Sequence, residues 1–103
     1  MRKAGWMESV ATTLEHDADR HQYRLLRDGE VVSIADYRPL ADGTTLVFHH
    51  TLTAPAHRGN GFAAELVGRA LDDVRAGGHK VVPTCWFVEE YLGLHPEYAD
   101  LRA

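Results

Sequence analysis

With 103 residues, 45% of them hydrophobic, the chain is long enough for one modest core and too short for two ordinary domains. We therefore expect a single domain over residues 1–103, with residues 1–5 disordered. A formal net charge of -4 with few clustered Lys and Arg residues argues against nucleic acid as a partner. One cysteine excludes an internal disulfide, and the absence of a long apolar segment argues against a membrane, so we expect a cytoplasmic protein.

The first half of the sequence predicts short strands joined by tight turns. Residues 8–14 are a weak strand candidate, and residues 16–20 form a polar connection. Two β-prone runs at 23–26 and 31–37 flank an Asp-Gly pair, which is a strong hairpin signal. These features indicate an antiparallel β-meander.

The second half predicts a strand, a loop, a helix and a second strand. A turn at residues 41–43 leads into a strand candidate over 44–53, and apolar residues then recur at helical spacing over 63–74. A glycine pair ends this helix, and residues 79–85 read as the next strand. A right-handed crossover would make these two strands parallel. We therefore predict an α+β fold, in which an antiparallel β-meander is followed by a β-loop-α-β crossover and a C-terminal helix.

The turn that opens this helix contains Arg58, Gly59, Asn60, Gly61, Phe62 and Ala63. Glycines allow the backbone to approach a ligand closely, and the unpaired N–H groups of a helix's first turn favour phosphate. The short string alone fits an ordinary turn equally well. It lacks the G-K-[ST] of a P-loop and the glycine pattern of a dinucleotide site, which leaves the pyrophosphate of another carrier.

A longer pattern extends from His50 to Leu101. It comprises H-T-x-x-x-P-x-x-R-G-x-G-x-A, V-V-P-x-C, an aromatic-rich helix and H-P-E-Y. This combination resembles a small, single-domain branch of the GNAT superfamily of acetyl-CoA-dependent N-acetyltransferases, and residues 23–39 resemble the same branch more loosely. The resemblance implies a GNAT-like fold and transfer of an acetyl group from acetyl-CoA to an amine of a small molecule or a protein. A noncatalytic module that binds coenzyme A is the alternative.

The resemblance also implies where the cofactor lies. In the superfamily, the loop that begins at Arg58 wraps the coenzyme A pyrophosphate, and the strands before the loop and after the helix splay apart. The pantetheine arm enters this cleft and bonds to strand backbone near Leu52, Thr53 and Ala54. Larger members insert helices that commonly shape the acceptor pocket, and this chain has no room for them. Its sequence therefore identifies neither the acceptor amine nor the oligomeric state.

Two residues are the first candidates for catalysis. By resemblance, Cys85 stands near the thioester at the end of the second splayed strand, although a free cysteine is often a buried small hydrophobe. His50 occupies a position that small-branch relatives fill with histidine, and it would act as general base or orient Cys85. Strand alternation predicts that His49 points to the opposite face. Relatives often carry an acidic residue where Leu52 stands, and the route, direct or through an acetyl-cysteine, stays open.

Tyr91 is the third candidate. Many superfamily members have a helix tyrosine that protonates the departing coenzyme A thiolate, and the helical spacing places Tyr91 on one face with Phe87. The alternative is a core aromatic residue. The seven histidines show no H-E-x-x-H spacing and one cysteine cannot build a multi-cysteine zinc site, so we predict no metal.

Overall fold

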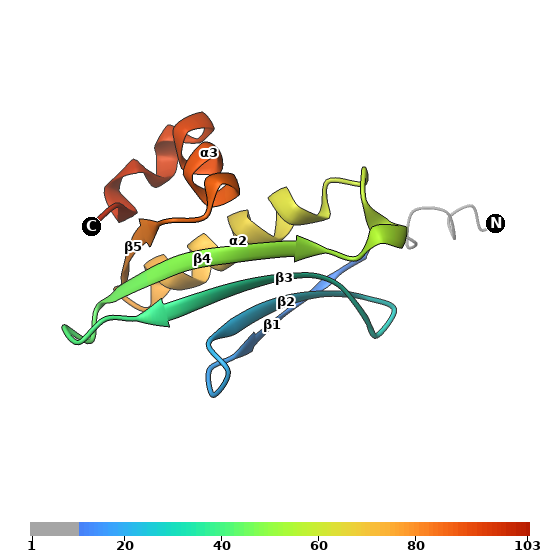
Figure 1. Ribbon diagram of the computed structural model, residues 1–103, viewed down its shortest axis with the longest axis horizontal. Helices are drawn as coiled ribbons and strands as arrows, with labels where there is room; N and C mark the ends of the chain where they lie inside the picture. Colours follow the sequence, from blue (N-terminus) through green and yellow to red (C-terminus); the bar gives the residue numbers. More distant parts are fainter. Residues whose placement is uncertain (1–10) are drawn as a thin grey trace.

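The structure, a computed structural model, describes residues 11–103 (Figure 1). Its strands are β1 (Thr13–Asp17), β2 (Gln22–Arg27), β3 (Glu30–Pro39), β4 (Thr45–Thr53) and β5 (Lys80–Pro83). Its helices are α2 (Phe62–Ala76) and α3 (Trp86–Leu94), with short 3-10 turns η1 (Pro55–His57) and η2 (Pro96–Leu101). None of the helices in this described part is long and apolar enough to cross a membrane.

One sheet contains all five strands in the order of the chain. Strands β1 to β4 are antiparallel neighbours, and β5 pairs with β4 in parallel. The predicted meander and parallel crossover are therefore confirmed, as is the mixed α+β fold class. The expected disorder of residues 1–5 and the start of the strand candidate at residue 8 lie outside the described residues.

The first strand differs from its prediction. It runs through Asp17, so residues 16 and 17 belong to a strand and the turn occupies residues 18–21. The pairing with β2 explains the difference, because His16 lies opposite Tyr23 and stacks on its ring. The polar residues of this segment predicted a connection, because the local sequence gives no sign of a contact with a neighbouring strand.

The hairpin between β2 and β3 follows the local sequence closely. Asp28 and Gly29 both have positive φ, at 52° and 79°, as a two-residue hairpin turn with the twist of the strands requires. Gly43, in the turn before β4, also has a positive φ of 73°. Turn chemistry thus fixes both connections of the meander.

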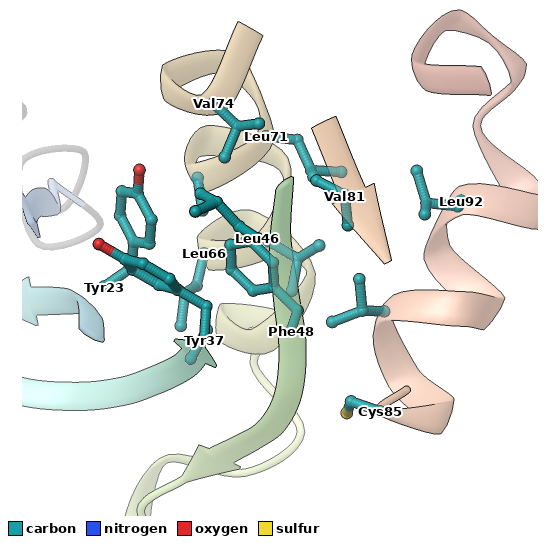
Figure 2. Packing of buried hydrophobic residues seen from close by; sticks show 14 of the residues in the cluster. Tyr23, Tyr37, Leu46, Phe48, Leu66, Leu71, Val74, Val81, Cys85 and Leu92 are labelled. Carbon is teal, nitrogen blue, oxygen red and sulfur yellow. The ribbon is translucent and has the colours of Figure 1, made fainter. Parts of the chain in front are cut away.

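Helix α2 lies along one face of the sheet and buries its apolar side there (Figure 1). Figure 2 shows how Tyr23, Tyr37 and Phe48 of the sheet meet Leu66 and other helix side chains in the core. Five of the six apolar positions that predicted the helix are buried: Leu66, Val67, Ala70, Leu71 and Val74. At about 1.5 Å per residue, its 15 residues separate its two ends by about 22 Å.

Strand β5 is shorter than predicted. Its last pair is Phe48 with Pro83, after which the N–H groups of Thr84 and Cys85 both donate to the Phe48 carbonyl at 3.0 Å. Proline has no N–H to extend the ladder, and α3 begins at Trp86. Since β4 continues to Thr53, its last residues have no partner in β5, and the two strands separate there.

A second irregularity lies at the same point of β4. Phe48 pairs with Tyr37 and His50 with Asp36, so His49 is an extra residue on β4. This is the arrangement of a β-bulge, which bends a strand and re-aims its side chains. The bulge and the end of β5 together mark where the candidate site begins.

Candidate functional site

The loop between β4 and α2 has an open, glycine-lined surface. Gly59 and Gly61 have φ values of 85° and 75°, and Gly61 is the residue immediately before the first turn of α2. A Cβ at either glycine would meet no protein atom within 4 Å. A pocket of about 200 Å³ lies over the loop, lined by Thr53, His57, Arg58, Gly59, Gly61, Phe62, Ala63, Ala64 and Phe87.

The charges around this pocket suit an anion. The first-turn N–H groups of α2 carry the positive end of the helix dipole. Arg58 is exposed, and its Nε donates to the Thr53 carbonyl at 3.2 Å, which holds its guanidinium against the loop. The one acidic residue of this first turn, Glu65, is paired with Arg69 at 3.3 Å. The residues present therefore fit a pyrophosphate group.

The free edge of β4 leads into this pocket. The Ala54 N–H donates to the Val32 carbonyl at 2.9 Å, and the Leu52 carbonyl accepts the Ser33 hydroxyl at 3.2 Å. Both groups are thus engaged by β3. Alternation along an antiparallel strand turns the backbone groups of Thr53 toward the other edge, where β5 has ended. Of the three residues expected to bond pantetheine, Thr53 directs its backbone groups toward the free edge of β4. The Leu52 carbonyl and the Ala54 N–H are already bonded to β3.

Cys85 lies at the point where β4 and β5 separate. It immediately precedes α3, its side chain is 8% exposed, and its Sγ is 3.6 Å from the Thr51 hydroxyl oxygen. Figure 2 shows the sulfur at the margin of the core, below α3. The position at the end of the post-helix strand is as the sequence indicated, and Thr51 is a neighbour that it did not indicate.

His50 has a different environment. It is exposed and lies opposite Asp36, whereas Thr51 lies opposite the buried Ala35. His50 is therefore on the sheet face away from Cys85, and no hydrogen bond joins the two within residues 11–103. The predicted orientation of Cys85 by His50 is not seen. The bulge also interrupts the alternation assumed for the histidine pair, and both His49 and His50 are exposed.

Asp36 is the site residue that sequence reasoning missed. It pairs with His50 in the strand register, and its carboxylate accepts a hydrogen bond from Gln22 Nε2 at 2.8 Å. It is therefore the acidic residue that the register of β3 places beside His50. Only the register of β3 against β4 brings the two together, and no local motif around Asp36 marks it.

Tyr91 lies in a groove between α2 and α3. The groove, of about 220 Å³, shares the lining residues Ala64 and Phe87 with the loop pocket. The ring of Tyr91 stacks on His95 with centroids 3.9 Å apart, and its hydroxyl packs against Gly68. Burial and nearby carboxylates raise the pKa of Tyr91. The contacts with His95 and Gly68 are those of a packed aromatic residue, and proton donation by Tyr91 stays a prediction.

Sequence and structural comparisons assign this arrangement to a known family. The model of the GCN5-related N-acetyl-transferase family matches residues 22–101. The chain is 32% identical to Protein NATD1 of Mus musculus over 87 residues, covering 81% of this chain and 76% of that protein. It is 30% identical to Protein NATD1 of Xenopus tropicalis over 91 residues, covering 85% and 81%.

Solved structures share the fold. A GCN5-like protein of Staphylococcus aureus superposes with a TM-score of 0.66 at 16% identity, over 88% of this chain and 87% of that one. N-acetylglutamate synthase of Neisseria gonorrhoeae, solved with coenzyme A and N-acetyl-glutamate, gives 0.54 at 15% identity, over 77% and 20%. Together with the glycine loop, the parallel crossover and the separated strands, the family match leads to one conclusion: the chain belongs to the GCN5-related N-acetyltransferase family.

Proposed function

We propose that this protein transfers an acetyl group from acetyl-CoA to an amine. The observation that carries the proposal is the open glycine loop at the start of α2, beside the point where β4 and β5 separate. Positive φ values at Gly59 and Gly61 turn the loop without side-chain bulk, which suits close approach of a pyrophosphate. The known coenzyme A complex of N-acetylglutamate synthase, which shares the fold, supports the same cofactor.

The chain's own residues would divide the binding as follows. The backbone N–H groups from Gly59 to Ala63 and the Arg58 guanidinium would hold the pyrophosphate. The N–H of Thr53 would hold the pantetheine arm along the free edge of β4, since Arg58 occupies the Thr53 carbonyl. Phe87 lines the same pocket from α3 and would cover the arm from the other side.

Acetyl-CoA, when bound, supplies a thioester carbonyl that an amine nitrogen attacks, with loss of the thiolate. His50 lies on the sheet face away from Cys85, so the amine would enter the gap between β4 and β5 from the His50 face. His50 would then accept the proton that the attacking amine gives up, because an imidazole is suited to that task near neutral pH. Asp36, opposite His50, would stabilise the resulting positive charge. Cys85 would line the acetyl end of the cleft, next to Thr51.

A noncatalytic coenzyme A-binding module is the second candidate. Two observations favour it: Leu52 stands where relatives often carry an acidic residue, and His50 makes no hydrogen bond to Cys85 within the described residues. Such a protein would keep the loop and the cleft while lacking proton transfer. The two candidates differ in turnover, not in cofactor binding.

The test combines a binding measurement with an assay of thiol release. Calorimetry with coenzyme A measures binding at the glycine loop. Release of free thiol from acetyl-CoA in the presence of a panel of primary amines measures acetyl transfer. We expect binding together with amine-dependent thiol release. Binding without release for any amine would favour the noncatalytic module, and no binding of coenzyme A would contradict both candidates.

A further inference from the structure

A second pocket lies at the other end of α2, away from the glycine loop. It has a volume of about 550 Å³, within the range of small-molecule sites. Its polar and aromatic lining consists of His16, His21, Tyr23, Tyr37, Asp73 and His79. None of these residues has a part in the proposed acetyl transfer.

The aromatic rings of this pocket form a continuous wall. The His16 ring stacks on Tyr23 with centroids 4.1 Å apart, and its Nε2 lies 2.6 Å from the Tyr37 hydroxyl. The Tyr37 ring also lies 5.4 Å from His21 and 5.7 Å from Tyr23. Tyr23 and Tyr37 are buried at 1% and 6% exposure, so the wall is fixed by the core. Faces of aromatic rings attract cations.

Asp73 gives the pocket a negative charge. Its Oδ2 accepts the Tyr23 hydroxyl at 2.6 Å, and its side chain remains 49% exposed. Among the described residues, none donates a hydrogen bond to the other carboxylate oxygen, which is therefore available to a ligand. Burial and this hydrogen bond raise the pKa of Tyr23, so the hydroxyl remains a donor to Asp73.

The backbone adds to this charge. Ala76 and Gly77, at the C-terminal end of α2, line the pocket, and the negative end of the helix dipole lies there. The described lining contains neither Lys nor Arg, and the basic side chain next to Asp73 is His16, whose Nδ1 lies 3.6 Å from Asp73 Oδ2. The nearest basic residue on the last turn, Arg75, is paired with Asp100 at 2.5 Å and lies over Tyr98 instead.

The pocket is separate from the cofactor site. The two lie toward opposite ends of α2, which is about 22 Å long. Phe48 and Leu46 stand in the core between the tyrosines and Cys85, as Figure 2 shows. A ligand here would not reach the thioester through this packed layer. The pocket is thus not the acceptor site of the proposed reaction.

We propose that this pocket binds an organic cation, with an ammonium group at Asp73 and an apolar or aromatic body against the Tyr23 and Tyr37 wall. The free carboxylate oxygen would accept a charge-assisted hydrogen bond. The rings and the helix C-terminus would hold the remaining positive charge. The pocket would select a ligand by its positive charge, and the ligand would not serve as an acetyl acceptor.

The test uses benzylamine as the cationic probe and benzyl alcohol as its neutral counterpart, at pH 8, in amide NMR titrations of the full chain. We expect benzylamine to cause saturable shifts of the amide signals around Gly43, Ala76 and Gly77. Benzyl alcohol should bind at the same place with an affinity at least about tenfold lower. Asp73→Asn should weaken benzylamine about tenfold or more, since it removes the charge and keeps an oxygen for Tyr23.

Asp72→Asn is the matched control. Asp72 is the preceding residue of α2 and accepts the Tyr98 hydroxyl at 2.7 Å, outside the pocket. We expect its benzylamine affinity to stay within about twofold of wild type, because screening weakens exposed charges at a distance. Ala76→Leu, at an exposed lining position, should weaken benzylamine by filling the pocket without changing its charge.

The proposal is overturned if benzylamine gives no saturable shifts at the pocket, or if benzyl alcohol binds equally well. It is also overturned if Asp73→Asn binds as wild type does. Should Asp73→Asn fail to fold, Ala76→Leu decides, and an unchanged affinity in that variant overturns the proposal.

Discussion

Cys85 and Thr51 meet at the point where the two strands separate, with 3.6 Å between sulfur and hydroxyl oxygen. We expect Cys85→Ala to keep coenzyme A affinity, since the loop is untouched, and to lower turnover by changing the acetyl end of the cleft. Cys85→Ser is the control that keeps a polar partner for Thr51. Thiol release and calorimetry measure the two effects. Wild-type turnover in Cys85→Ala would reduce Cys85 to a packing residue.

His50 and His49 are adjacent and both exposed, but only His50 lies opposite Asp36. We expect His50→Gln to lower turnover about a hundredfold or more, as loss of a general base does, and His49→Gln to lower it much less. Thiol release from acetyl-CoA by the two variants measures this difference. Equal turnover of His50→Gln and His49→Gln would contradict the role of His50.

At the scale of elements, the contact between α2 and α3 depends on a glycine. A Cβ at Gly68 would lie 2.5 Å from the Tyr91 hydroxyl and 3.4 Å from the ring carbon that bears it. Gly68→Ala should therefore lower the free energy of unfolding, although alanine in a helix interior normally raises it by about 0.5–1 kcal/mol. In a Tyr91→Phe background, where the hydroxyl is gone, the same change should become stabilising.

Urea unfolding of the four proteins, wild type, each single variant and the double variant, measures this coupling. An equal effect of Gly68→Ala in both backgrounds would show that the hydroxyl does not limit the approach of the two helices.

The turn before β4 is fixed by a single carboxylate. Asp42 accepts bonds from the Thr45 hydroxyl at 2.6 Å and from the N–H groups of Thr44 and Thr45 at 2.9 and 2.8 Å. The Thr45 hydroxyl first, and then the two N–H groups, hold the pKa of Asp42 below its usual value. The stabilisation is therefore present at neutral pH and is lost as pH falls through this lowered pKa.

We expect Asp42→Ala to lower the melting temperature at pH 7 and to have a smaller effect at an acid pH, because the wild-type carboxylate loses its charge as pH falls through its lowered pKa. Thermal unfolding of both proteins at the two pH values checks this. A difference that is equal at both values would mean that the charge of Asp42 does not support the turn.

The elements that the sequence predicted well are those set by local chemistry. The Asp28-Gly29 turn, the apolar stripe of α2 and its glycine end each depend on a few neighbouring residues. The length of β5, the bulge at His49 and the pairing of His50 with Asp36 depend on contacts between strands. Strand register cannot be read from single-strand patterns, and a bulge changes which face a side chain occupies.

The same distinction applies to the site. The loop from Arg58 to Ala63 was predictable because its glycines and the helix that follows are adjacent in sequence. The expected partnership of His50 and Cys85 joined residues on two strands and assumed regular alternation, which the bulge interrupts. Asp36, 14 positions before His50, becomes its neighbour only through the antiparallel pairing.

At the scale of the whole molecule, α2 connects two pockets of opposite character. Its N-terminal end, with Arg58 and the glycine loop, suits an anion, and its C-terminal end, with Asp73, suits a cation. The small sheet and a single crossover helix are sufficient to place both. The acetyl-transfer account depends on the first pocket alone.

The central claim is that acetyl-CoA binds on the loop at Gly61. Gly61→Ala should abolish or strongly weaken binding, because the added methyl group would occupy the open surface on which the pyrophosphate is expected to lie. Gly43→Ala is the matched control, since Gly43 has a φ of 73°, equally open surroundings and a place in a distant turn. Each substitution should cost about 1 kcal/mol of stability.

The most direct measurement is the intact mass of the three proteins under native conditions with acetyl-CoA. We predict that wild type and Gly43→Ala each gain the mass of one acetyl-CoA and that folded Gly61→Ala does not. The added mass should be lost on denaturation, unless an acetyl group stays on Cys85. An acetyl-CoA complex of Gly61→Ala as abundant as that of the wild type, or no complex with the wild type, would contradict the account.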